Sequence, residues 1–360
     1  GRFQEKTDLL IRDGRISAIG TGLAAEGEEM LDLGGDLLLP GFVDVHIHAF
    51  KGMDTMQGEE AVRHMSRELK KVGVAAFLPT TMSASPEDTV RALAGVKAVM
   101  ERPEPDGAIV LGAHMEAPFL AEAKAGAQLK QYFVDPDEEN WQRYTGGLES
   151  VVRLITMAPE RAGALAFISA LTKKGITVSI GHTTADAETT HAAAEAGATH
   201  VTHTFNAQTP LNHRAPGVPG AALVDDRLQC EVISDGIHLH PDIVKLIIRT
   251  KGKEKLVAIT DAMEAAGMPD GQYQLGGQEV FVHEGAARLK DGTLAGSTLT
   301  MIRAFQNLIR FGATPEEAAL MTTKTPALSI GNEELGEIEL GAPAIFSRFD
   351  ENYAFKGTVG

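Results

Sequence analysis

Two histidines that could bind a metal ion, His46 and His48, lie one residue apart in the segment Pro40–His48. The apolar residues of this segment follow a Pro-Gly turn and predict a buried strand. Successive side chains of a strand point to opposite faces, so both imidazoles face the same side. Two neighbouring imidazoles at a strand end can hold one ion. Taken alone, the pair is equally compatible with two hydrogen-bonded core histidines.

Histidine or a carboxylate also ends four later strand-like segments: Glu116, His182, His203 and Asp261. Histidine and carboxylate suit zinc or iron, and the absence of a cysteine ligand argues against a purely structural zinc site. Individually, Glu116 could be a salt-bridge partner and His203 a packed imidazole. The six residues together predict a catalytic metal centre. Asp44, His114 and His200 lie in the same segments, and we expect structural roles for the first two and the opposite strand face for His200.

The elements that position these residues alternate between strand and helix. The predicted strands are 42–48, 75–80, 109–116, 152–157, 176–182, 200–205, 228–234 and 256–261. The predicted helices are 59–72, 86–100, 161–174, 186–196 and 241–250, with 301–311 and 314–321 closing the series. This alternation over about 250 residues predicts an α/β fold, a (β/α)8 TIM-like barrel with its chemistry at the carboxyl ends of the strands. A doubly wound open sheet is the alternative, but no Gly-rich dinucleotide motif follows the early strands.

Short strands at both ends of the chain predict a small β-sandwich domain. Residues 8–20 form two β runs around Asp13-Gly14, a strong hairpin signal, and 37–39, 344–348 and 353–359 add further strands. We place this domain at residues 1–40 with 335–360, and the barrel at 41–334. Residues 272–294 are typical of hairpins inserted after the eighth strand, and the Gly-Pro-rich segment 215–220 predicts a loop.

Composition narrows the possible partners. The net charge of −16 argues against nucleic acid or an anionic membrane, and an anionic substrate would need a local basic pocket. No apolar run approaches the roughly 20 residues of a membrane span, and no signal-peptide pattern opens the sequence. The single cysteine, Cys230, excludes an internal disulfide and fits a cytoplasmic protein.

The motifs resemble the amidohydrolase superfamily and, within it, the N-acetylglucosamine-6-phosphate deacetylases. The matching segments cover nearly the whole chain in order: 40–48, 112–119, 156–160, 181–184, 202–207, 234–238, 259–262 and 294–301. The His-x-His pair marks only the superfamily, whereas Ala-Pro-Glu, Phe-Asn-Ala, Asp-Gly-Ile-His and Ala-Gly-Ser point to the deacetylases. The resemblance implies metal-dependent hydrolysis of N-acetyl-D-glucosamine 6-phosphate to glucosamine 6-phosphate and acetate, in amino-sugar catabolism and cell-wall recycling.

The same resemblance assigns roles to individual residues. It implies a main metal site at Glu116, His182 and His203, and a second ion at His46 and His48 that Glu116 would bridge. One or two divalent ions, zinc or iron, would therefore bind each subunit. Asp261 matches the catalytic acid–base. The implied substrate-binding residues are Ala127, Gln128, Asn206, Ala207, Arg214, His238, Leu294, Ala295 and Gly296. A homodimer would complete the phosphate pocket across its interface.

Two positions depart from the family pattern, and several alternatives stay open. The family usually has Gly where this chain has Ala117, and some members have His where this chain has Gln128, whose amide could polarise the acetyl carbonyl. A galactosamine-epimer deacetylase, a cyclic amidase or a non-catalytic barrel scaffold remain alternative functions. The sequence does not distinguish the two epimers.

Overall fold

The strands of the central barrel follow one another in chain order in a computed structural model that describes residues 7–23 and 29–360. The sheet order is β4-β7-β9-β10-β11-β12-β13-β14, with every neighbouring pair parallel and a parallel bridge between Ile47 and Ala262 bringing the last strand to the first. The strands are β4 (Phe42–Ile47), β7 (Val74–Thr81), β8 (Ile109–Val110), β9 (Ala113–Met115), β10 (Val152–Met157), β11 (Thr177–Ile180), β12 (His200–Val201), β13 (Gln229–Ile233) and β14 (Leu256–Ile259). The predicted (β/α)8 barrel is confirmed.

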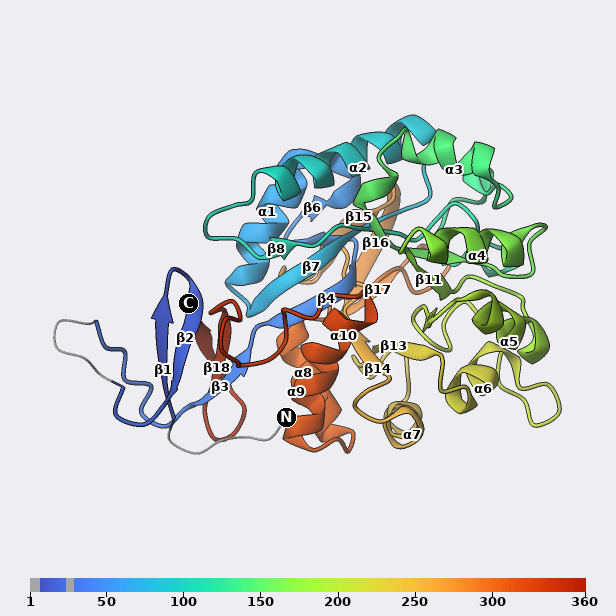
Figure 1. Cartoon of the computed structure of the whole chain (residues 1–360). Helices are drawn as coiled ribbons and strands as arrows, with labels where there is room; N and C mark the ends of the chain where they lie inside the picture. The colour runs from blue at the N-terminus through green and yellow to red at the C-terminus, as the bar shows by residue number, and fades with distance from the viewer. Residues whose placement is uncertain (1–6, 24–28) are drawn as a thin grey trace.

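Helices surround this barrel, as Figure 1 shows. They are α1 (Glu59–Lys70), α2 (Pro86–Glu101), α3 (Glu138–Thr145), α4 (Ala164–Lys173), α5 (Ala187–Ala196), α6 (Gly217–Val224), α7 (Pro241–Lys251), α8 (Met301–Arg310), α9 (Pro315–Thr322) and α10 (Lys324–Ser329). Their starts follow local rules. The Ser85 side chain caps α2 ahead of Pro86, and Thr314 forms a capping box with Glu317 at the start of α9. Every residue of β4 and β7 is buried, as expected for parallel strands covered on both faces.

Two small sheets are built from strands near the ends of the chain, and one of them combines strands from both ends. One pairs β1 (Asp8–Arg12) with β2 (Arg15–Gly20), and the other joins β3 (Leu37–Pro40), β18 (Phe346–Phe349) and β19 (Phe355–Val359). Ile16 and Phe346 belong to a hydrophobic cluster separate from the barrel core. Figure 1 shows β1, β2, β3 and β18 together beside the barrel. The boundaries at residues 40 and 335 stay a prediction, and residues 1–6 and 24–28 of the predicted domain lie outside the described residues.

Several segments differ from the sequence-based prediction. The sixth strand ends at Val201 rather than Phe205, because the backbone turns where His203 and Phe205 adopt positive φ angles of 28° and 79°. The predicted loop at 215–220 is largely helix α6. Its Pro219 lies in the first helical turn, where a missing N–H leaves no hydrogen bond unmade. Helices α3 and α10 were not predicted.

The inserted segment after the eighth strand is a three-stranded antiparallel sheet of β15 (Gly271–Leu275), β16 (Gln278–His283) and β17 (Ala286–Arg288). It packs through Leu275 and Val280 against Met82 and Met263 in a cluster of its own. The insertion therefore lies over residues that follow barrel strands. Within residues 7–23 and 29–360, no helix has both the length and the apolar character needed to cross a membrane.

Candidate metal centre

The six predicted ligands lie together at the carboxyl ends of five different barrel strands. All six are at least 92% buried: His46, His48, Glu116, His182, His203 and Asp261. Their side-chain nitrogen and oxygen atoms form two groups, each close enough for a single ion. Strand ends far apart in sequence therefore meet at one point, as the barrel geometry predicts.

The first group contains Glu116, His182 and His203. Glu116 Oε1 lies 3.1 Å from Nε2 of each histidine, and the two Nε2 atoms lie 3.1 Å apart. Three atoms at these separations around one point form a nearly equilateral triangle. An ion above the triangle could reach all three and keep a further position open, as in catalytic sites.

The second group contains His46, His48 and Asp261. The two Nε2 atoms lie 3.4 Å apart, and Asp261 Oδ1 lies 3.5 Å from the first and 3.2 Å from the second. Glu116 also reaches this group, because its Oε1 lies 3.4 Å from His46 Nε2 and its Oε2 lies 3.1 Å from His48 Nε2. One carboxylate thus touches both groups, which is the arrangement expected of a bridging ligand.

The donor set fits divalent ions. A tetrahedral ion with bonds of about 2.0–2.1 Å keeps its ligand atoms about 3.3 Å apart, which matches the separations in both groups. Hydrogen bonds without a metal ion explain this arrangement less well. His182 and His203 both point Nε2 at Glu116 Oε1, and the two Nε2 atoms also face each other at 3.1 Å. The residues present therefore suit one or two divalent metal ions.

The backbone at these strand ends adopts an uncommon conformation. His182, His203 and Asp261 have positive φ angles of 46°, 28° and 50°. Such angles are costly for residues with a Cβ and cluster at functional sites. The turn after His182 is held by Glu160, which accepts hydrogen bonds from the backbone N–H and hydroxyl of Thr184 at 2.6 and 2.8 Å. The fold therefore holds these three side chains in place at some energetic cost.

Hydrogen bonds to the other ring nitrogens fix two of the imidazoles. His182 Nδ1 donates to the carbonyl of Lys124 at 2.8 Å, and His46 Nδ1 donates to Glu231 Oε2 at 3.1 Å. A proton on Nδ1 leaves the Nε2 lone pair free for a metal ion. Sequence reasoning did not identify Glu231, although a carboxylate in the middle of the apolar strand β13 is a usable signal.

The carboxylates and imidazoles shift one another's pKa values. Burial alone would lower the pKa of His48, but bonds to Asp261 and Glu116 outweigh it and raise the pKa to about 10. Burial opposes ionisation of Glu116, yet His46 and His182 hold its pKa well below the usual range. Burial is likewise outweighed at Asp261, where His46 and His48 lower the pKa. The carboxylates are therefore ionised, as metal ligands and proton acceptors must be.

Gln128, a predicted substrate-binding residue, contacts the carboxylate of Glu116. Its Nε2 donates to Glu116 Oε2 at 2.5 Å, while its Oε1 accepts from the Ser83 backbone N–H at 2.7 Å. The neighbouring Ala127 carbonyl accepts a hydrogen bond from Gln278 of the inserted sheet at 2.5 Å. Ala117 is not among the described residues with positive φ, so the methyl group that replaces the family's glycine is tolerated.

Other predicted substrate residues lie beside the two metal groups. Residues 294–296 follow the insertion, and a Cβ on Gly296 would lie 3.1 Å from the Asp261 carbonyl. Asn206 donates its side-chain amide to the His203 carbonyl at 3.2 Å, and the Ala207 carbonyl accepts from Thr183 N–H at 3.1 Å. Leu294 and Ala295 lie in the same segment, and Ala295 is fully buried. These residues border the metal groups from strands six and eight.

Arg214 and His238, the predicted phosphate ligands, lie in loops after strands six and seven. Arg214 is exposed in the loop before α6, and its backbone N–H donates to Asn212 at 3.2 Å. His238 Nδ1 donates to Asp235 Oδ2 at 2.7 Å, which leaves Nε2 as the ring atom available to a ligand. The structure does not bring these two residues into contact with the six ligands.

Asp44, His114 and His200 lie below the ligands. Burial raises the pKa of Asp44 to about 7, and Asp44 accepts a hydrogen bond from Thr260 at 2.6 Å. His114 Nε2 lies 2.8 Å from the Thr156 hydroxyl, so it serves the interior of the barrel. His200 Nδ1 lies 3.4 Å from Glu231 Oε1. This contact places the His200 ring inside the barrel, so the prediction that it points to the opposite face is wrong.

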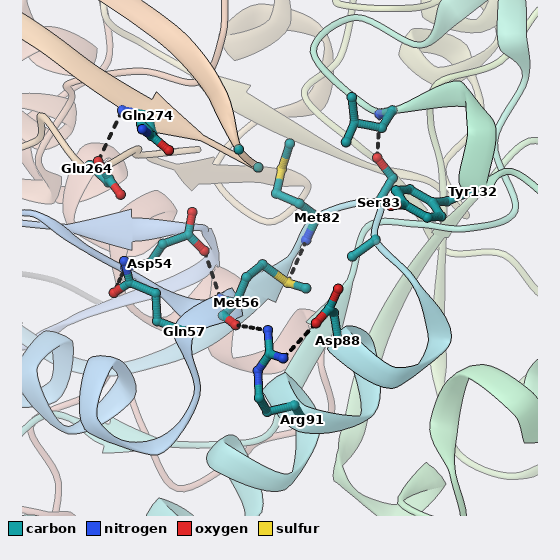
Figure 2. A pocket seen from close by; sticks show the side chains of 14 residues that line it. Asp54, Met56, Gln57, Met82, Ser83, Asp88, Arg91, Tyr132, Glu264 and Gln274 are labelled. Atoms are coloured by element: carbon teal, nitrogen blue, oxygen red, sulfur yellow. Dashed lines mark hydrogen bonds and ion pairs between the residues drawn. The ribbon is translucent and has the colours of Figure 1, made fainter.

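A cavity of about 330 Å3 lies between the inserted sheet and residues that follow β4, β7 and β9 (Figure 2). Its polar groups bond to one another or to nearby backbone. Asp54 accepts from Met56 N–H at 2.8 Å, Arg91 donates to Asp88 at 2.6 Å, and Glu264 accepts from Gln274 N–H at 3.1 Å. None of the predicted site residues lines this cavity.

Comparison with known proteins gives a consistent result. Residues 37–357 match the model of the amidohydrolase family. The chain is 38% identical to the N-acetylglucosamine-6-phosphate deacetylase of Lysinibacillus sphaericus, over 99% of this chain and 92% of that protein. It is 37% identical to an N-acetylgalactosamine-6-phosphate deacetylase of Escherichia coli O157:H7, over 93% of this chain and 88% of that one.

A solved structure agrees with these matches. A mutant of the Mycobacterium smegmatis N-acetyl-D-glucosamine-6-phosphate deacetylase, in complex with N-acetyl-D-glucosamine-6-phosphate, superposes with a TM-score of 0.90. The two are 34% identical over 98% of this chain and 92% of that one. With its barrel, its two ligand groups and these matches over nearly its whole length, the chain belongs to the amidohydrolase family.

Proposed function

We propose that the protein hydrolyses the acetamide of N-acetyl-D-glucosamine 6-phosphate, releasing D-glucosamine 6-phosphate and acetate. The observation that carries the proposal is the convergence of Glu116, four histidines and Asp261 on one buried point. The deacetylases of Lysinibacillus sphaericus and Mycobacterium smegmatis, similar over nearly the full chain, support the choice of substrate.

The residues of the centre account for both difficult parts of amide hydrolysis, a poor electrophile and a poor leaving group. A divalent ion held by Glu116, His182 and His203, or by both groups, would supply Lewis acidity toward water and the acetyl carbonyl. Asp261 is ionised and lies 3.2 Å from His48 Nε2, at the edge of the group. Its carboxylate accepts a proton from the attacking water and then donates it to the departing nitrogen.

Recognition of the phosphate requires positive charge in a protein whose net charge is −16. The guanidinium of Arg214 suits bidentate contact with phosphate oxygens, and His238 offers a second donor. Asn206, Ala207 and residues 294–296 border the centre on the side of strands six to eight. The sugar would lie across these residues, with its acetamide over the metal groups.

Two alternatives differ in substrate. The Escherichia coli O157:H7 relative is named for the galactosamine epimer, which differs at one hydroxyl. No contact in the structure selects between the epimers. A cyclic amidase would not need the exposed Arg214. A non-catalytic scaffold is disfavoured, because it would have no use for six converging ligands.

The test is a comparison of three substrates with metal-replete protein: N-acetylglucosamine 6-phosphate, N-acetylgalactosamine 6-phosphate and N-acetylglucosamine. We expect kcat/KM to be highest for the first and to fall by more than about tenfold without the phosphate, since charge-assisted bonds contribute more than neutral ones. Comparable kcat/KM with and without phosphate would overturn the substrate class, and a higher value for the galactosamine compound would establish the epimer.

We further propose a homodimer in which Arg214 completes the phosphate pocket of the partner. Arg214 is exposed and outside contact range of its own metal ligands. In a two-fold dimer, such a loop reaches the partner's site reciprocally. Asp261→Asn and Arg214→Ala homodimers should both be poorly active, whereas a heterodimer of the two holds one site with both residues intact. A purified heterodimer as inactive as its parents would contradict this arrangement.

The cellular setting is also part of the proposal. Cys230 is buried and is the single cysteine of the sequence, so no internal disulfide can form. This fits a reducing cytoplasm, where phosphorylated amino sugars from catabolism or cell-wall recycling would be the substrates.

A further inference from the structure

Glu231 is a fully buried carboxylate on β13, a barrel strand that lies between β12 and β14 and contributes none of the six predicted ligands. Its exposed fraction is 0%, and both of its oxygens have partners. Oε2 accepts from His46 Nδ1 at 3.1 Å and from the His203 backbone N–H at 3.2 Å, while Oε1 lies 3.4 Å from His200 Nδ1. A buried carboxylate is costly unless such bonds compensate it.

Two of these contacts connect Glu231 to the two metal groups, one contact to each group. The bond to His46 orients a ring whose Nε2 belongs to the group of His46, His48 and Asp261. The bond to the His203 N–H supports the backbone of a residue in the other group, at the turn where φ is 28°. One side chain therefore touches a ligand ring of one group and the main chain of the other.

The contact with His46 also determines which ring nitrogen carries the proton. A carboxylate that is 3.1 Å from Nδ1 requires a proton there, which leaves the lone pair of Nε2 directed toward His48 and Asp261. The second histidine of this group has no such support, since His48 Nδ1 is buried and has no hydrogen-bond partner among the described residues. His46 is thus the oriented ligand of its group.

We propose that Glu231 is a positioning residue that fixes His46 in the Nδ1–H tautomer and thereby sets the affinity of the second metal ion. This inference rests on the proposed metal-dependent function. Outer hydrogen-bond partners of metal-binding histidines typically contribute 10–100-fold to metal affinity. Glu231→Gln should therefore weaken binding of the second ion by about that factor. The first ion should be affected less, because Glu231 contacts this group only through the His203 backbone N–H and not through a ligand side chain.

The measurement is a titration of metal-free protein with Zn²⁺ against a competing chelator, with elemental analysis of the bound zinc. His200→Asn is the matched control, because it removes a second partner of Glu231 from the same buried site while leaving the bond to His46. We expect two ions in the wild type, weaker second-ion binding in Glu231→Gln and nearly normal binding in His200→Asn. Equal weakening in both variants would mean that Glu231 only neutralises charge in the core, and would overturn the proposal.

A second measurement does not depend on the folding of any Glu231 variant. In wild-type protein labelled with ¹⁵N-histidine and loaded with Zn²⁺, nitrogen shifts should show His46 protonated at Nδ1, with His46→Asn used for assignment. A His46 ring without a proton on Nδ1, or a wild type that binds one ion only, refutes the proposal. Both readouts are independent of turnover. Wild-type protein that binds two ions but deacetylates no sugar phosphate would contradict the proposed function and leave the role of Glu231 intact.

Discussion

Replacing Glu116 by glutamine should reduce metal binding more than replacing both His46 and His48 by asparagine. Glu116 Oε1 lies 3.1 Å from His182 and His203 Nε2 and 3.4 Å from His46 Nε2, while Oε2 lies 3.1 Å from His48 Nε2. Glu116→Gln removes a negative charge from both groups and substitutes a weaker neutral ligand. The double variant His46→Asn with His48→Asn leaves the group of Glu116, His182 and His203 complete.

The expected change in the free energy of unfolding follows from the coupling between ion binding and folding. An ion present at 100 times its Kd stabilises the folded state by about 2.7 kcal/mol, so two such ions contribute about 5.4 kcal/mol. Adding a chelator should then lower the free energy of unfolding of the wild type by about 5 kcal/mol and that of the double variant by about half as much. Glu116→Gln should respond least, because it starts with few bound ions.

The assay combines elemental analysis with chemical denaturation, each variant being measured with and without chelator. Glu116 forms buried pairs with four histidines, and losing them changes stability even without metal. This change cancels when each protein is compared with itself, with and without chelator. A change in the denaturation midpoint at constant slope gives the change in stability. Equal losses of metal in the two variants would refute the assignment of Glu116 as the bridging ligand.

Three further predictions concern single residues. Asp261→Asn should lower kcat by about 10²–10⁴-fold, since the amide cannot accept the proton, and substantial turnover by the metal-replete variant would contradict that role. Gln128→Ala should weaken metal binding about 10–100-fold, because the amide bonds Glu116 at 2.5 Å; loss of kcat with unchanged metal affinity would instead indicate contact with the acetyl carbonyl. Bonds from Lys51 and Lys71 lower the pKa of Glu68 from 4.5 to about 2, so its stabilising contribution is present above pH 4.5 and is lost as the pH falls toward 2. Acid unfolding of Glu68→Gln should therefore be less steep across that window than in the wild type, and identical curves would contradict the shift.

The sequence alone determined the barrel and the candidate ligands at its strand ends, because both depend on local patterns. A short apolar run followed by histidine or a carboxylate identifies a buried strand and the residue at its carboxyl end, and β10 spans Val152–Met157 as predicted. In a parallel barrel all carboxyl ends lie on one side, so residues from position 46 to position 261 could be placed together without coordinates. The hairpin around Asp13-Gly14 and the Pro-initiated helices α2 and α9 are local in the same way.

Only the tertiary structure decided how those residues contact one another. The hydrogen bond between His46 and Glu231 joins residues 185 positions apart in the sequence. It forms because the closed barrel brings β13 near β4. Gln128 meets Glu116 because a loop folds back over the strand end. The early end of β12 results from the positive φ angles at His203 and Phe205, which are uncommon for residues with a Cβ. Local pattern thus selects the ligands, whereas the partners that orient them are set by long-range packing.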